Sequence, residues 1–246
     1  MSLFDVAALF VVADGEGCVG NQVTVDAIEA TYYQENEETL PDALVRAVQQ
    51  ANARLYQRRE AMALEWLDGT STCTAAVLCG DTIYGAHVGA SRAYLVQQGQ
   101  IKQLTQDHTW VGAMVRAGKL QPQEQRTHPK RYLITHSILG SEDHDLAIDT
   151  FAESVQSGDC VVFCTDGLWH LVDDEELCAL VERYGPQQST ESLIQLANER
   201  GGTRQHHGRG GQALTLTNAS VLRARGRSAS PLPHSERVSY LRCFVS

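Results

Sequence analysis

Two aspartates each follow an apolar run and precede a glycine. They are Asp14, in Phe-Val-Val-Ala-Asp-Gly, and Asp166, in Val-Val-Phe-Cys-Thr-Asp-Gly. Such runs are typical of buried strands, so we expect each carboxylate to be held firmly at the end of a sheet. Two carboxylates of this kind can converge on a hard cation such as Mg²⁺ or Mn²⁺, which prefers oxygen ligands. Asp-Gly is also a common turn dipeptide, so either site taken alone favours a structural turn.

The elements that would position these carboxylates are grouped by type along the chain. Apolar patterning and turn residues predict strands at Leu9–Ala13, Thr72–Leu78, Thr82–Val88, Ser91–Val96, Gln100–Leu104 and Val161–Cys164. The predicted helices are Asn21–Tyr33, Leu40–Arg58, Thr109–Ala117, Pro122–Gln125, Asp174–Glu182 and Thr190–Glu199. The joints Cys79-Gly80-Asp81, Gly89-Ala90 and Gln98-Gly99 suit hairpins. Because strands and helices do not alternate, the sequence predicts an α+β fold with antiparallel pairing.

Composition excludes several classes of protein. The 246 residues are 43% hydrophobic and carry a net charge of −10, which supports a sizeable core and argues against nucleic-acid binding. No apolar run is long enough to span a membrane, and the N-terminus lacks the basic region of a secretory signal. The seven cysteines are odd in number and lie mainly in apolar runs, as reduced thiols of a cytoplasmic protein do.

The composition changes at Gly201–Gly202. From there to Ser246 the chain has seven arginines and one acid, Glu236, with little apolar periodicity. This pattern is typical of disorder or of a sequence never selected to fold. We therefore expect one domain over residues 1–202 and a disordered or non-native tail over 203–246, which lacks the apolar alternation needed to pair as a central strand.

Two kinds of phosphate chemistry are excluded by residue spacing. No cysteine has an arginine six residues after it, as a cysteine-dependent phosphatase needs. The glycines from Gly15 to Gly20 are followed by Asn21-Gln22, whereas a P-loop ends in Gly-Lys-Ser/Thr.

Several motifs occur together in a fixed order. They are VVADGEGC, GTSTCTAAVL, VGASRAYL with QLTQDHTW, THPKRYLITHSILG and SGDCVVFCTDGLWHLVDDEEL. From about Leu9 to Gly202 this succession resembles the metal-dependent protein phosphatase (PPM) family in its bacterial Ser/Thr phosphatase form. The resemblance implies a sandwich of two antiparallel β-sheets flanked by helices. It also implies that a water bridged by two Mn²⁺ or Mg²⁺ ions attacks phosphoserine or phosphothreonine in a protein, without a phosphoenzyme.

The same resemblance implies roles for individual residues. Asp14 would bridge both metals, the Gly15 carbonyl would bind the second metal, and Asp166 would bind the first. No catalytic residue beyond these ligands is implied, and the residues that bind substrate stay unknown. The segment from about Asp107 to Tyr132 would form a flap beside the site. The implied partners are phosphoproteins and a cognate Ser/Thr kinase, with no nucleic acid or membrane, and the chain is expected to be a cytoplasmic monomer.

The sequence departs from the family pattern in ways that weaken the metal site. Only 13 residues precede Asp14, without the family's phosphate-binding Arg. Ala90 stands where the family's Val-Gly-Asp-Ser-Arg motif has a metal-binding Asp, and Glu16 adds a negative charge. The fold is therefore expected to be incomplete at both ends.

The last departure is the family's final strand, Asp-Asn-Ile-Thr-Val-Val-Val-Val, which is absent after Gly202. Codons that encode Arg204 to Gln212, read one base later, can encode that strand, so we interpret the tail as frameshifted. Asp14, Gly15 and Asp166 are then the remaining ligands. Three hypotheses stay open: a phosphatase of impaired activity, a catalytically silent relative that binds a phosphoprotein or kinase, and a damaged gene product.

Overall fold

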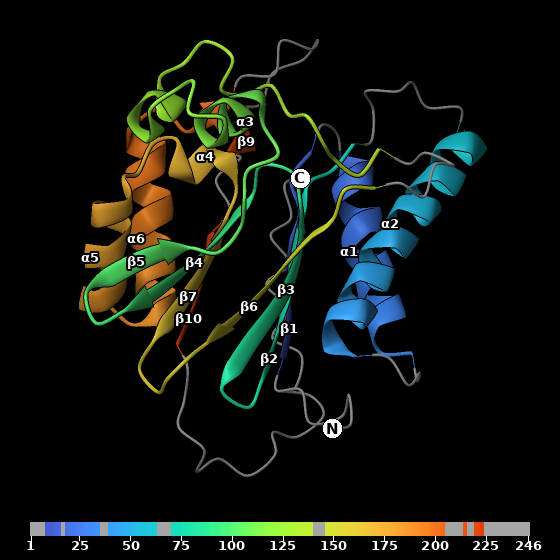
Figure 1. Cartoon of the computed structure of the whole chain (residues 1–246), viewed down its shortest axis with the longest axis horizontal. Coiled ribbons are helices and arrows are strands. Elements are labelled where there is room, and N and C mark those ends of the chain that lie inside the picture. The colour runs from blue at the N-terminus through green and yellow to red at the C-terminus, as the bar shows by residue number, and fades with distance from the viewer. Residues whose placement is uncertain are drawn as a thin grey trace.

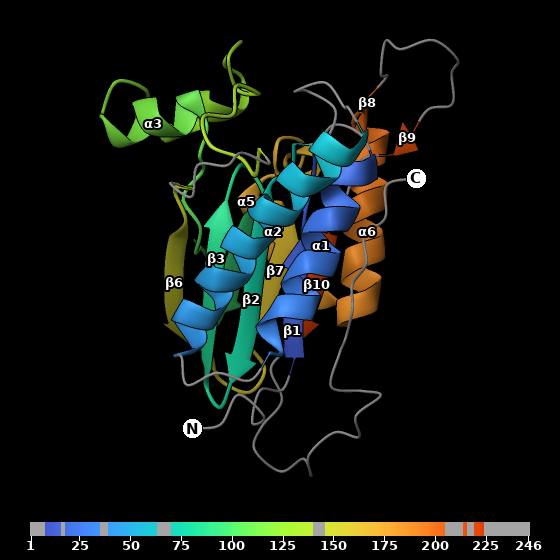
Figure 2. The ribbon, with the colours of Figure 1, turned by 90° about the vertical axis from the view of Figure 1, so that its right-hand side faces the viewer.

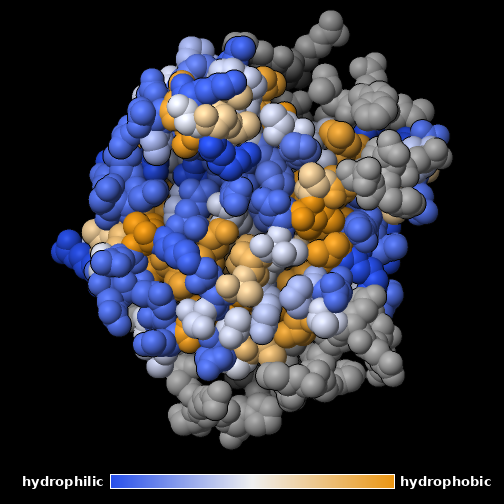
Figure 3. All heavy atoms as spheres, viewed as in Figure 1, coloured by the Kyte–Doolittle hydropathy of each residue, from blue (hydrophilic) through white to orange (hydrophobic). Residues whose placement is uncertain are grey.

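Strands and helices form four layers in the order helices, sheet, sheet, helices (Figure 1). The computed structural model describes residues 8–15, 18–34, 39–62, 70–139, 146–204, 214–215 and 219–223. The two sheets are antiparallel and pack face to face, which confirms the α+β sandwich. Hydrophilic residues cover most of the face in Figure 3, and apolar residues gather in small groups near its middle.

The first sheet has strand order β1-β2-β3-β6. Its strands are β1 (Ala8–Val12), β2 (Cys73–Cys79), β3 (Thr82–Val88) and β6 (Asp149–Ser154). Helices α1 (Cys18–Tyr32) and α2 (Leu40–Met62) cover its outer face (Figure 2). The face of α2 that packs on this sheet includes Leu44, Val48 and Leu55, which are fully buried. Burial of this apolar stripe is what attaches the helix pair to the sheet.

The second sheet has strand order β10-β7-β4-β5. Its strands are β4 (Arg92–Gln97), β5 (Gln100–Gln103), β7 (Cys160–Cys164) and β10 (Ala219–Arg223). On its outer face lie α4 (Asp166–Trp169), α5 (Asp174–Arg183) and α6 (Pro186–Glu199). A core containing Val12, Ile83, Leu95, Val161 and Phe163 fills the space between the two sheets.

The connection from β5, in the second sheet, to β6, in the first, carries α3 (Trp110–Arg116) and the 3₁₀ helix η2 (Pro122–Arg126). It lies at one end of the sandwich (Figure 1). The expected hairpin at Gly89-Ala90 is wrong, because β3 and β4 belong to different sheets and the chain crosses between them there. The hairpins at Cys79-Gly80-Asp81 and Gln98-Gly99 are confirmed by the β2–β3 and β4–β5 pairings.

The segment after Gly202 contains strands, contrary to the expectation from its composition. β8 (Thr203–Arg204) pairs with β9 (Leu214–Thr215), and β10 pairs along the whole of β7. The physical reason is that an edge strand needs backbone pairing more than apolar alternation, and Ala-Ser-Val-Leu-Arg allows it. The remaining residues of the expected tail lie outside the described ones, and the frameshift stays a hypothesis.

Two further expectations from composition concern cysteines and membranes. Cys73, Cys79, Cys160 and Cys164 are buried, as the apolar runs around them predicted, and Cys178 is buried as well. Every helix in the described ranges is too short or too polar to cross a bilayer.

Candidate functional site

Asp14 and Gly15 form a close turn against the start of β2. The amide of Asp14 donates to Thr72 Oγ1 at 3.0 Å, and the amide of Thr72 donates to the Asp14 carbonyl at 2.6 Å. A Cβ on Gly15 would lie 1.9 Å from the Thr70 carbonyl oxygen, so no other residue fits without moving the backbone. The predicted turn is therefore held on both sides of Asp14.

A short chain of hydrogen bonds and strand pairs joins this turn to the second sheet. Thr72 Oγ1 lies 2.8 Å from Ser91 Oγ, and Ser91 immediately precedes β4. The first residue of β4, Arg92, pairs with Cys164 at the end of β7. Asp166 follows two residues later, so Asp14 and Asp166 lie at the same end of the sandwich.

Asp166 is the first residue of the four-residue helix α4 and is 9% exposed. Thr165, fully buried, precedes it in an extended conformation and serves as the N-cap residue. Leu168 and Trp169 are fully buried in the core beneath α5 and α6. Trp169 Nε1 also donates to the Ala90 carbonyl at 2.9 Å, which ties α4 to the start of β4.

The donor set suits a hard cation in chemical type but is small. Asp14, the Gly15 carbonyl and Asp166 offer only oxygen, as Mg²⁺ and Mn²⁺ prefer, and Mg²⁺ often keeps several waters beside one or two carboxylates. Across the described ranges, no three His, Cys, Asp or Glu side chains are grouped so that they could hold a metal ion. Ala90 supplies no side-chain donor. The ligand roles of Asp14, Gly15 and Asp166 remain predictions.

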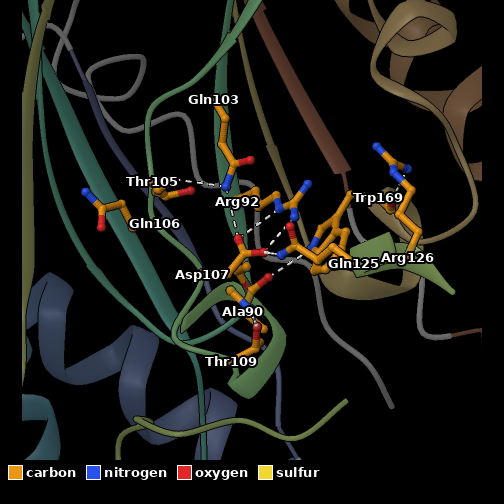
Figure 4. A network of polar contacts seen from close by, with 12 residues as sticks. Ala90, Arg92, Gln103, Thr105, Gln106, Asp107, Thr109, Gln125, Arg126 and Trp169 are labelled. Atoms are coloured by element: carbon orange, nitrogen blue, oxygen red, sulfur yellow. Dashed lines mark hydrogen bonds and ion pairs between the residues drawn. The ribbon is translucent and has the colours of Figure 1, made fainter. Parts of the chain in front are cut away.

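A buried ion pair lies beside these elements (Figure 4). Arg92 Nε and Nη2 donate to the two carboxylate oxygens of Asp107 at 2.8 and 2.6 Å, and Nη1 donates to Tyr94 OH at 2.8 Å. The Arg92 guanidinium carbon lies 3.5 Å from the centre of the Trp169 ring. Burial raises the pKa of Asp107, but the charge and hydrogen bonds of Arg92 outweigh it, so the net pKa is lowered. The pair is charged and joins β4 to the start of the predicted flap.

Two buried histidines lie where the first sheet meets the predicted flap. They are His87, in β3, and His108, at the start of the flap. His87 Nδ1 lies 2.9 Å from Thr74 Oγ1, and its Nε2 lies 3.1 Å from the carbonyls of Gly89 and Gln106. Because both carbonyls are acceptors, Nε2 carries the proton and Nδ1 accepts from Thr74. Burial, reinforced by neighbouring His108, lowers the pKa of His87 to about 4. His87 is thus neutral at physiological pH.

The sequence interpretation gave Arg92 and Trp169 no role and named Asp107 only as the start of the flap. A signal was present, since Arg92 and Asp107 both lie in motifs quoted for the resemblance, and a charged residue in an apolar strand needs a partner. The spacing of 15 residues between them does not reveal that they pair. The sequence does not reveal the contacts of the flap with the end of α4 either, because they join residues more than 40 positions apart.

Comparisons with known proteins agree with the resemblance. The family described as Protein phosphatase 2C matches residues 5–111. The chain is 30% identical to the serine/threonine phosphatase stp of Listeria welshimeri over 210 residues, covering 80% of this chain and 81% of that protein. It is also 30% identical to the serine/threonine protein phosphatase PstP of Mycobacterium tuberculosis over 82% of this chain, which spans only 39% of that protein's length.

The fold is similar to a solved catalytic domain of PstP in complex with two manganese ions. The TM-score is 0.71 at 26% identity, and the alignment covers 87% of this chain and 85% of that one.

Proposed function

We propose that this chain, which belongs to the protein phosphatase 2C (PPM) family, hydrolyses phosphoserine or phosphothreonine esters in proteins with the help of Mn²⁺ or Mg²⁺. The observation that carries the proposal is the placement of Asp14 and Asp166 at one end of the sandwich. Thr72 and Ser91 link the Asp14 turn to β4 through their 2.8 Å contact, and β4 pairs with the strand that leads to Asp166. The solved PstP domain, which contains two manganese ions, supports the same assignment for the family.

In this proposal the chain's own residues hold the charges in place. Asp14 and Asp166 offer carboxylate oxygens, and the Gly15 carbonyl adds a neutral one. When bound, the cations make a nucleophile available from water at neutral pH and neutralise the phosphoryl oxygens. The hydrogen bonds of Thr72 keep Asp14 in position, and the buried side chains of α4 keep Asp166 in position.

We further propose that turnover by this chain is weak. Two carboxylates offset only half of the charge of two divalent cations, and Ala90 removes one more ligand of the family pattern. The same two observations favour the second candidate function, a catalytically silent relative that binds a phosphoprotein or its kinase.

The proposal also covers the oligomeric state, the compartment and the partners of the chain. We propose a monomer that acts in the cytoplasm beside a Ser/Thr kinase and on its targets. The burial of cysteines in apolar strands supports a reducing compartment, since thiols there stay reduced.

Hydrolysis of p-nitrophenyl phosphate with Mn²⁺ tests these statements. We expect low activity from the chain as given and none from Asp14→Asn or Asp166→Asn. A variant whose codons after Gly202 are restored to Asp-Asn-Ile-Thr should bind Mn²⁺ more tightly and hydrolyse faster. Undiminished activity in both Asn variants would overturn the assignment of the site, and no hydrolysis with intact phosphoprotein binding would favour the silent relative.

A further inference from the structure

The predicted flap returns to the sandwich through two adjacent side chains at the end of η2. Gln125 Nε2 donates to Asp107 Oδ2, which also accepts from Arg92. Arg126 extends in the other direction, to the connection between α4 and α5. Figure 4 shows these side chains on either side of Trp169.

Arg126 binds the carboxyl-terminal end of α4. Its Nη1 donates to the carbonyls of Trp169 and Val172, the latter at 2.6 Å, and its Nη2 donates to Asp174 Oδ1 at 2.7 Å. The last carbonyls of a helix lack partners within the helix, and a cation there is favourable. The arginine side chain is 21% exposed, so water competes only partly for these contacts.

The contacts close into a ring around Trp169. The indole donates to the Ala90 carbonyl, and its ring lies against the Arg92 guanidinium. Arg92 pairs with Asp107, Asp107 accepts from Gln125, and the next residue, Arg126, returns to the Trp169 carbonyl. Helix α4 is therefore fixed to β4 by its indole and to the flap by its backbone.

The helix held in this way is short, and its first residue is Asp166. Since α4 has four residues, a movement at its last carbonyl is transmitted across barely one turn. We propose that Arg126 is a positioning residue: by fixing the end of α4 to the flap, it sets the place of Asp166 and hence the affinity of the site for Mn²⁺. This inference rests on the proposed role of Asp166 as a metal ligand.

Calorimetric titration of the 246-residue chain with Mn²⁺ tests the inference without an activity assay. Arg126→Met should raise the dissociation constant about tenfold or more, as loss of outer partners of metal ligands does. Arg126→Lys keeps the charge but cannot reach both carbonyls and Asp174, so its affinity should be intermediate. Lys119→Met removes a cation from an exposed position of the same segment and should leave the affinity unchanged.

A metal-free measurement reports on the docking of the flap. Trypsin should cleave after the exposed Lys130 faster in Arg126→Met than in Lys119→Met, at a temperature where both remain folded by circular dichroism. A merely structural role of Arg126 would lower the melting temperature without changing the Mn²⁺ affinity of the folded chain.

The outcomes separate the two proposals. If Asp166→Asn weakens Mn²⁺ binding while Arg126→Met binds as the unmodified chain does, the positioning role is wrong and the proposed function stands. If Asp166→Asn leaves Mn²⁺ binding unchanged, or the unmodified chain binds none, the proposed metal site fails and the positioning role fails with it.

Discussion

Arg92 and Asp107 are both almost completely buried, and a buried ion pair stabilises a protein only when its geometry is good and its remaining donors and acceptors are satisfied. Both conditions hold here. The pairing is bidentate, the third guanidinium nitrogen donates to Tyr94, and Asp107 also accepts from Gln103 at 3.0 Å. The cost of breaking the pair therefore lies in the charge that would be left behind.

Removing both partners of this pair should cost less than the two single removals added together. We expect Arg92→Met to lower the free energy of unfolding by about 3–5 kcal/mol, because it leaves a buried carboxylate without its cation. The double variant Arg92→Met/Asp107→Leu should lose less than the sum of the two single variants. Urea denaturation of all four proteins gives the coupling energy. Additive losses would show that the two side chains do not act as a pair.

The lowered pKa of His87 should make the stability of the protein depend on pH. Its folded pKa of about 4 lies below its ordinary value of 6.5, so the unfolded chain takes up a proton before the folded one. Above pH 6.5 neither state is protonated and the contribution is complete; it is lost as pH falls from 6.5 towards 4. The loss should amount to about 3 kcal/mol.

The measurement is urea denaturation at intervals across that range. His87→Gln removes the buried imidazole and should flatten the slope. Asp107, whose pKa is also lowered, adds a further loss at more acidic pH in both proteins. Equal slopes for the His87→Gln and unmodified chains would contradict the assignment of a neutral buried imidazole.

Among the helices and strands, apolar patterning predicted the elements whose position depends on burying an apolar side. The helix at Leu40–Arg58 and the strand at Val161–Cys164 were both predicted, because the hydrophobicity of single residues decides which side of an element is buried. Strand β6 was missed, since its residues alternate between half-buried and exposed at the edge of a sheet. At Gly89-Ala90 two neighbouring strands looked like a hairpin, and only the packing of two sheets distinguishes a crossing from a turn.

The Asp14-Gly15 turn after β1 allows a test of how tightly one local element is packed. Gly15→Ala would place a methyl group 1.9 Å from the Thr70 carbonyl oxygen and 2.9 Å from Asn21 Oδ1. The backbone must move, so we expect a loss of about 1–3 kcal/mol in stability and weaker Mn²⁺ binding through displacement of Asp14. Gly185→Ala is the matched control, because nothing lies within 4 Å of its new Cβ. Thermal melting and calorimetric titration of both variants measure the difference; equal behaviour would show that the turn tolerates a side chain.

For the whole molecule, composition predicted a domain boundary at Gly202, because arginine, glycine and serine dominate after it. The structure places β10 from that segment against β7, in the second sheet. Composition averages over many residues, whereas five residues suffice to complete a sheet edge when a partner strand is available. The candidate site shows the same limit: both Asp-Gly motifs could be found from the sequence, but the contacts that hold them depend on residues far apart in the chain.

The pairing of β10 predicts that residues after Gly202 contribute to stability. Deleting residues 205–246 removes β10 and leaves the backbone of β7 unpaired on that side, next to β4. At about 0.5–1.5 kcal/mol for each lost hydrogen bond, we expect a loss of about 2 kcal/mol or more, and hence a fall of about 4–8 °C in Tm. Deleting only residues 224–246 keeps β10, so the difference in Tm between the two truncated chains measures what residues 205–223 contribute. The newly exposed edge of β7 should also promote association of the shorter chain, which light scattering detects. Equal melting temperatures for the two truncated chains would show that β10 adds nothing to the sheet, and the domain would then end at Gly202 as its composition suggests.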